Sequence, residues 1–130
     1  MKPSEITPEM LQFLTERHLA TLTTMRSDGS PHVVAVGFSY DTSMRQARII
    51  TFSTAQKALN ALRGGRAAVS QVDDGRWLTL EGAVRLATMD NDPQEVRRAV
   101  DGYAQRYQDP KVRDNRVAVI IDVDRIMGRA

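Results

Sequence analysis

The chain has 130 residues, of which 42% are hydrophobic and 26% charged, so it can build one domain with a core of its own. It contains no cysteine, which excludes disulfides, thiolate catalysis and Cys-ligated metal centres. The 18 basic and 16 acidic residues are interleaved along the whole chain instead of forming a basic block, which argues against nucleic-acid binding.

The apolar runs are too short to cross a membrane. The longest are residues 33–38, which include a glycine, and residues 117–121, whereas a membrane-spanning helix needs about 20 apolar residues. The N-terminus also lacks the apolar core of a signal peptide. We therefore expect a soluble cytoplasmic protein whose partners include neither a membrane nor a nucleic acid.

The first half of the chain predicts a short helix followed by strands. Thr7 can cap a helix that has Pro8 at its first position and ends near residue 17. Residues 18–25 and 31–40 are rich in strand formers and flank a turn signal, which predicts a hairpin. A third strand is expected over residues 47–54, followed by a helix over residues 55–63 that a Gly-Gly pair ends.

The second half predicts three more strands, over residues 67–72, 77–87 and 116–124. Gly82 inside the fifth strand indicates a bulge, and a helix from about residue 90 to 107 precedes the last strand. These elements predict a mainly β domain with short helices that spans residues 1–130. Six antiparallel strands commonly close into a small barrel filled by side chains, so a sizeable ligand must bind outside it or between subunits.

Acid–base and metal chemistry find little support in the sequence. His18 and His32 lack the further ligands at suitable spacing that a metal site needs, so we expect no metal. No glycine-rich phosphate fingerprint is present, because the Gly64-Gly65 pair follows a helix instead of opening one. We assign no residue to a catalytic role from these patterns.

The strand-to-helix junction at residues 50–57 is the most suggestive stretch. It places three hydroxyl residues and Lys57 at a helix start, where free backbone N–H groups attract anions. Two interpretations remain open: an anion site, or a helix capped by Ser53 or Thr54 with Lys57 as an ordinary surface residue. Trp77, the only tryptophan, is likewise either a packing residue or a platform for a ligand.

Taken in order, these segments resemble the split β-barrel flavin and deazaflavin oxidoreductases related to pyridoxamine 5′-phosphate oxidase. The features that carry the resemblance are Ser-Pro-His-Val-Val at 30–34, the junction with Lys57 and Asn60, and Trp-Leu-Thr-Leu-Glu-Gly-Ala-Val at 77–84. Residues 17–22, 31–41, 70–72 and 103–107 are similar to the branch of coenzyme F420-dependent biliverdin reductases. The resemblance implies a six-stranded antiparallel split β-barrel.

The resemblance also implies a homodimer with two cofactor sites at the subunit interface. By position, the strand at residues 33–36 would run beside the cofactor ring through its backbone, and Ile50 and Thr51 would contact the cofactor from the third strand. Lys57 would bind the phosphate of the cofactor, and Trp77 would approach the ring from the partner strand. The residues expected to bind the cofactor are Val33, Val34, Ala35, Val36, Ile50, Thr51, Ser53, Gln56, Lys57, Asn60 and Trp77.

Two departures from the phosphate oxidases bear on cofactor and substrate. Gln56 stands where those enzymes carry an arginine that would form a bidentate phosphate fork, which favours coenzyme F420 over flavin mononucleotide (FMN). The chain ends at Ala130, without the extension that those enzymes use to hold their substrate, so we expect a substrate other than pyridoxamine phosphate.

The function implied by the resemblance is hydride transfer from reduced coenzyme F420 to biliverdin or a similar conjugated acceptor. Arginines would anchor the two propionates of biliverdin, and solvent or an arginine-bound group would supply the proton. The alternatives are an FMN-dependent oxidoreductase of the same fold, and a flavin-, deazaflavin- or haem-binding protein without catalysis. Cofactor titrations separate these alternatives, because fold-level analogy does not identify a substrate.

Overall fold

Seven strands and four helices make up the computed structural model, which describes residues 1–130. The helices are η1 (Pro3–Glu5), α1 (Pro8–Thr15), α2 (Gln56–Leu62) and α3 (Pro93–Arg106). The strands are β1 (Ala20–Met25), β2 (Pro31–Val36), β3 (Ser39–Asp41), β4 (Gln46–Phe52), β5 (Arg66–Asp73), β6 (Arg76–Ala87) and β7 (Arg116–Arg129). All pairings are antiparallel, in the order β2-β1-β5-β6-β7-β4-β3.

The prediction of six strands was wrong, because the strand expected over residues 31–40 is divided at Gly37 and Phe38. β2 pairs with β1, whereas β3 pairs with β4. The cause is tertiary: a Cβ at Gly37 would lie 3.0 Å from the rings of Tyr103 and Tyr107, and the Phe38 carbonyl accepts a hydrogen bond from Arg106. Side chains from α3 and the residue after it therefore hold the backbone where the ladder stops.

The sheet curls without closing. β2 pairs only with β1, and β4 beyond Arg48 pairs only with β7. Along a strand with one neighbour, alternate N–H and C=O groups face away from the ladder. The outer edge of β2 and the C-terminal part of β4 therefore carry backbone groups without a strand partner.

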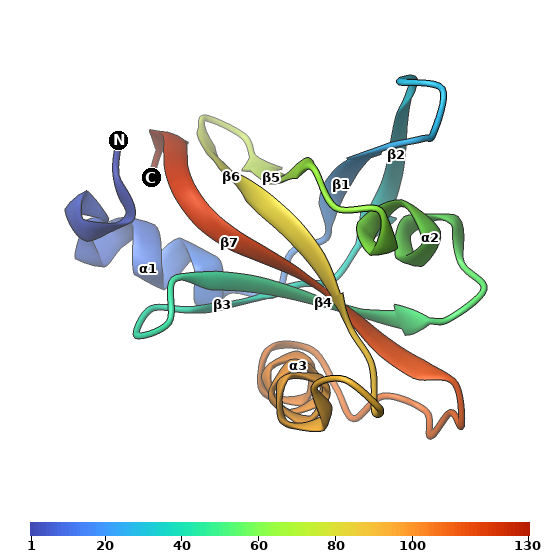
Figure 1. Cartoon of the computed structure of the whole chain (residues 1–130). Helices are drawn as coiled ribbons and strands as arrows, with labels where there is room; N and C mark the ends of the chain where they lie inside the picture. Colours follow the sequence, from blue (N-terminus) through green and yellow to red (C-terminus); the bar gives the residue numbers. More distant parts are fainter.

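The main core lies inside the curled sheet, and helices cover its openings. Nineteen buried residues form this core, with Phe13, Leu22 and Phe38 fully enclosed. A smaller cluster, which includes Val96 and Ile120, lies beneath α3. In Figure 1, α1 and α2 lie toward opposite ends of β7, and α3 packs outside the sheet near β4.

Local signals account for several element boundaries. Thr7 caps α1 as predicted, because its Oγ1 accepts a hydrogen bond from the backbone N–H of Met10 at 3.2 Å. The bulge is confirmed by a register shift between Glu81 and Gly82, where a Cβ on Gly82 would overlap the backbone of β7. The expected hairpin is also confirmed, as the pairing of β1 with β2.

Two boundaries differ from the sequence prediction. α2 has Ala55 as its N-cap and no side-chain cap, so the interpretation of Ser53 or Thr54 as a capping residue was wrong. β7 continues to Arg129 instead of ending near residue 124, because its C-terminal part pairs with β6 and buries Ile126. No helix is both long and apolar enough to cross a membrane.

Candidate functional site

A hollow of about 340 Å³ opens where the unpaired edges of β2 and β4 approach each other; we call it the edge hollow. Its lining comes from the end of β2 with Gly37, the end of β4, α2, α3 and residues 108–116. Because the sheet does not close here, the edge hollow lies where β2 and β4 have no strand partner on their outer sides. The open edge of the sheet thus forms a cleft.

Five of the residues expected to bind the cofactor line the edge hollow. They are Ala35, Val36, Ile50, Thr51 and Lys57. Ala35 and Val36 end β2, Ile50 and Thr51 end β4, and Lys57 lies in the first turn of α2. The fold therefore brings together residues from three elements that are separated in sequence.

Thr51 lines this hollow and carries a buried polar atom without a hydrogen-bond partner. Its side chain is 3% exposed, and Oγ1 is buried with no hydrogen-bond partner. Nearly all buried polar groups are hydrogen-bonded, since leaving one without a partner costs about 1–3 kcal/mol. The Thr51 hydroxyl is therefore a buried polar group for which this chain supplies no partner.

The charge around the edge hollow is positive and largely unpaired. Lys57, Lys111 and Arg113 form no ion pair or hydrogen bond through their side chains, and Arg113 lies over the Phe52 ring with Cζ 4.8 Å from its centroid. Arg116 donates only to backbone carbonyls, those of Lys111 at 2.6 Å and Thr51 at 3.4 Å.

Burial adds to the electrostatic cost of these cations. It lowers the pKa of Lys57, and it lowers the pKa of Arg116, to which repulsion from Arg113 also contributes. Asp109 is the only acidic residue in the lining. An anionic group in the edge hollow would relieve this repulsion and gain charge-assisted hydrogen bonds.

An aromatic wall completes the edge hollow. Tyr103 lines it and packs against Tyr107 with ring centroids 4.9 Å apart. The Tyr107 hydroxyl donates to the His18 carbonyl at 2.6 Å and accepts from the Phe38 N–H at 3.3 Å. Burial raises the pKa of Tyr107, which keeps its hydroxyl a donor. Tyr107 therefore fixes the ring of Tyr103 against the hollow.

Gln56 and Asn60 lie outside this lining and bind each other. Gln56 donates from Nε2 to Oδ1 of Asn60 at 2.7 Å, and the buried Asn60 donates from Nδ2 to Oγ1 of Thr24 at 2.9 Å. Arg63 donates to the same Asn60 oxygen at 3.0 Å. In this arrangement the two amides hold α2 against β1 and so position Lys57.

Four further predicted residues also lie outside the lining. Val33 is 59% exposed on the outer face of β2, whereas Val34 points inward and packs against the main core. Ser53 is exposed, and its backbone N–H donates to the Asn115 carbonyl at 3.0 Å. Trp77, 36% exposed, pairs with Val72 and Arg129 on the outer face of the sheet.

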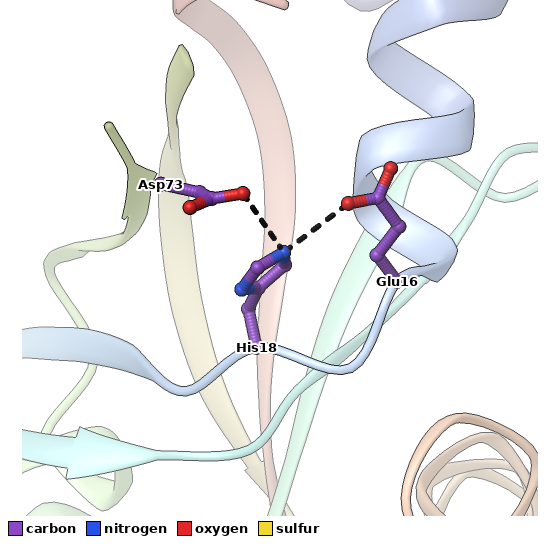
Figure 2. Close-up of side chains that lie close together, drawn as sticks. All are labelled: Glu16, His18 and Asp73. Carbon is purple, nitrogen blue, oxygen red and sulfur yellow. Dashed lines mark hydrogen bonds and ion pairs between the residues drawn. The ribbon is translucent and has the colours of Figure 1, made fainter. Parts of the chain in front are cut away.

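A second polar cluster, away from the edge hollow, joins Glu16, His18 and Asp73 (Figure 2). His18 Nε2 lies 3.2 Å from Glu16 Oε1 and 3.7 Å from Asp73 Oδ2. Arg76 donates to the Glu16 carboxylate at 2.9 Å and to the Asp73 carboxylate at 2.6 Å. The hydrogen bond from Arg76 to Glu16, together with a second one from His18, lowers the pKa of Glu16 to about 2. Since Arg76 already supplies the opposing charge, the cluster is an ion-pair network that connects α1 to β5 and β6.

Two groups of residues could not be predicted from the sequence: the aromatic and basic part of the edge hollow, and the cluster of Glu16, His18 and Asp73. Tyr103 and the basic residues of 111–116 come to the edge hollow only through the fold, and Asp73 is distant in sequence from His18. The available signal was the spacing of Lys111, Arg113 and Arg116 directly after an Asp-Pro break.

Comparisons with known proteins cover nearly the whole chain. F420H2-dependent biliverdin reductase from Mycobacterium tuberculosis is 48% identical over 127 residues, which are 98% of this chain and 90% of the relative. A conserved hypothetical protein from the same organism has a similar solved structure, with a TM-score of 0.77 and 22% identity over 95% of this chain and 84% of that chain. An F420 reductase has a TM-score of 0.72 and 21% identity over 94% of this chain and 98% of that chain.

The two structural neighbours show that the fold is shared. The sequence relative also shows membership of a common family, because its identity extends over almost the whole chain. The pyridoxamine 5′-phosphate oxidase family matches residues 6–129, from the segment before α1 to the end of β7. With a family match and a close relative that both span the chain nearly end to end, this chain belongs to the pyridoxamine 5′-phosphate oxidase family.

Proposed function

We propose that this protein is a coenzyme F420-dependent reductase that transfers a hydride to biliverdin or a similar conjugated acceptor. The observation that carries the proposal is that one hollow is lined by Thr51, whose buried hydroxyl has no hydrogen-bond partner, and by Lys57, whose ammonium forms no ion pair. The relative that is 48% identical bears the name of such a reductase, which supports the cofactor and the acceptor.

The residues of the edge hollow fit this cofactor. Lys57 would hold its phosphate, with Arg113 and Arg116 adding positive charge nearby, and the Thr51 hydroxyl would bond to a polar atom of the cofactor. The free backbone groups along β2, at Val33 to Val36, would bind the cofactor through hydrogen bonds. Gln56 supplies no second cation, because its amide is neutral, and that amide is already bonded to Asn60. The lack of a second cation favours coenzyme F420 over FMN.

When bound, reduced coenzyme F420 supplies a hydride, and the protein's own residues provide position and surroundings. Ala35, Val36 and Ile50 give an apolar wall that excludes water, while the cations hold the anionic parts of both reactants. Reduction of the acceptor also consumes one proton. We assign its source to solvent, because no histidine lines the hollow and its one carboxylic acid, Asp109, is exposed.

We infer that the protein acts as a homodimer through the outer face of β2, β1, β5 and β6. This face exposes Val33 at 59% and Val72 at 68%, and Trp77 lies on it as well. Between them the face is built from small residues such as Ser70, which packs beside Thr79. Ala35 belongs both to this face and to the edge hollow, so a second subunit docked here would border the cofactor site.

Fluorescence titration of the purified protein with coenzyme F420 tests the cofactor assignment. We expect saturable binding, and Lys57→Ala should weaken it at least tenfold, because a charge-assisted hydrogen bond to phosphate is worth about 1.5–3 kcal/mol. Lys2→Ala, which removes an exposed lysine near the N-terminus, is the matched control. Absence of saturable binding to the wild type would contradict the proposal.

The alternatives give different results in the same experiments. A yellow protein that releases flavin on denaturation identifies an FMN-dependent enzyme. Tight deazaflavin binding, without oxidation of the reduced cofactor by biliverdin or other conjugated acceptors, identifies a binding protein without turnover. Bilirubin formation, followed by absorbance, is the result expected for the reductase.

A further inference from the structure

A second hollow, of about 450 Å³, lies between α3 and the segment that follows it; we call it the helix hollow. It shares residues 109–111, Arg113 and Arg116 with the edge hollow, so the two hollows adjoin along this segment. Residues that line only the helix hollow include Met89, Val100 and Val112. One continuous surface therefore runs from the proposed cofactor site to the flank of α3.

The helix hollow has an apolar lining that no other part of the chain covers. Val96, 2% exposed, belongs to the cluster beneath α3 and forms its floor. Met89, which is 48% exposed, and Val112, which is 98% exposed, also line it. Large apolar side chains left open around a concavity favour an apolar ligand.

The rim of the helix hollow is cationic, and its cations lack carboxylate partners. Arg97 projects from α3 and makes no ion pair or hydrogen bond, and the same holds for Lys111 and Arg113. The next residue, Arg98, is paired with Glu95 at 2.7 Å. Arg97 therefore lies on the side of α3 where no carboxylate of this chain neutralises it.

Two acidic residues, Asp101 and Asp109, also line the helix hollow, and neither lies within ion-pair distance of these cations. Four cations, namely Arg97, Lys111, Arg113 and Arg116, face these two acids. An apolar floor with excess positive charge at the rim is complementary to a molecule with an apolar body and pendant carboxylates.

We propose that the helix hollow binds a carboxylate-bearing arm of the acceptor, with Arg97 as the anchor for the carboxylate. This proposal rests on the proposed function, because it assigns the acceptor a place beside the cofactor. The conjugated part of the acceptor reaches over Pro110 into the edge hollow, while Val100 and Val112 contact its apolar edge. The cofactor phosphate belongs instead to Lys57, which lines only the edge hollow.

The test compares biliverdin with its dimethyl ester, which keeps the conjugated system and lacks the two carboxylates. Binding of each to the cofactor-free protein is followed by absorbance and induced circular dichroism. We expect the wild type to bind biliverdin more tightly than the ester. Arg97→Ala should raise the Kd for biliverdin about tenfold, the effect of one charge-assisted hydrogen bond, and leave the Kd for the ester within twofold.

Two further variants make the test specific. Arg17→Ala removes an arginine that lines neither hollow and makes no hydrogen bond or ion pair, so both Kd values should stay unchanged. Val112→Asp alters the apolar wall at a position that is 98% exposed, so folding is unaffected, and it should weaken both ligands.

An unchanged ratio of the biliverdin and ester Kd values in Arg97→Ala would overturn the proposal. Coenzyme F420 affinity, measured in the same variants, should equal that of the wild type. Failure of the wild type to bind coenzyme F420 instead rejects the proposed function, and the bilin titration still reports on the helix hollow. The two failures are therefore distinguishable.

Discussion

The Arg48 guanidinium on β4 donates from Nε to the Glu95 carboxylate on α3 at 2.9 Å, and both side chains are buried, at 5% and 3% exposed. Arg48 also donates to Asp41 at 2.9 Å and to Gln46 at 2.8 Å, so its charge and its donors are satisfied. This contact attaches α3 to the sheet. It therefore also positions Tyr103 and the segment after α3, which line the candidate site.

Glu95→Gln and Arg48→Met should each destabilise the protein by about 1.5–3 kcal/mol, because each removes charged hydrogen bonds from a buried network, in which Asp41 still faces Arg48 and Arg98 still faces Glu95. The double variant Arg48→Met with Glu95→Leu should lose less than the two single effects combined, since it leaves no unpaired charge in the pair. Urea unfolding followed by circular dichroism measures these free energies. Additive losses would show that the two residues are not coupled.

Acid should destabilise the fold through the same network. Burial alone would raise the pKa of Asp41, but hydrogen bonds from Met44, Ser43 and Arg48 lower it to about 2. Burial also acts to raise the pKa of Glu95, but the hydrogen bonds and charges of Arg48 and Arg98 outweigh it, so this pKa too is lowered. A depressed carboxyl pKa gives stability that is complete above the unfolded-state pKa, near 3.8 for Asp, and is lost as pH falls through the folded-state value.

We therefore expect the free energy of unfolding to be level near pH 6 and to fall between about pH 4 and pH 2. Asp41→Asn should make this decline shallower, because it removes one of the groups that must be protonated. Urea titrations at a series of pH values provide the measurement. A wild-type curve that stays flat down to pH 2 would contradict the assigned pairing.

Thr51→Val should separate stability from binding. The substitution removes the buried hydroxyl that has no partner, so the free energy of unfolding should stay the same or rise by about 1 kcal/mol. The same change should weaken coenzyme F420 binding several-fold, because the ligand loses a hydrogen-bond partner. Thermal unfolding and the fluorescence titration give the two quantities. Thr54→Val, at an exposed position in the turn that follows β4, is the control.

Gly37→Ala should act through the aromatic wall. Its Cβ would lie 3.0 Å from the rings of Tyr103 and Tyr107, so these rings must move by a few tenths of an ångström. Overpacking of this kind costs about 1–3 kcal/mol. We expect a lower unfolding temperature together with weaker cofactor binding. Gly29→Asn, at an exposed turn whose φ is 85°, keeps the rings in place and should leave cofactor binding unchanged.

Local signals in the sequence predicted the elements whose ends are determined locally. The cap at Thr7, the turn between β1 and β2 and the bulge at Gly82 all depend on residues adjacent in sequence or on a single glycine. The break at Gly37 depends on tyrosines more than 60 residues further along the chain, so no local pattern could indicate it.

The residues of the candidate site also fall into two groups, those that a local sequence pattern indicates and those that only the fold brings to the site. Thr51 and Lys57 could be named beforehand because a strand-to-helix junction concentrates hydroxyls and a cation in a few residues. Tyr103 and Arg113 join them only because α3 docks on β4 through the Arg48–Glu95 pair. Asn60 resembles a site residue in sequence, yet its amide is satisfied by Thr24, Gln56 and Arg63.

Because the sheet is not closed, its strands differ in how easily they open locally. β2 is fastened along one side only, so opening of this strand requires fewer backbone hydrogen bonds to break than opening of any strand inside the ladder. A ligand that bonds to the edges of both β2 and β4 occupies the place of a missing strand. Such a ligand takes the place of an eighth strand between β2 and β4. Its binding therefore lowers the rate of local opening of β2, and its release raises it again.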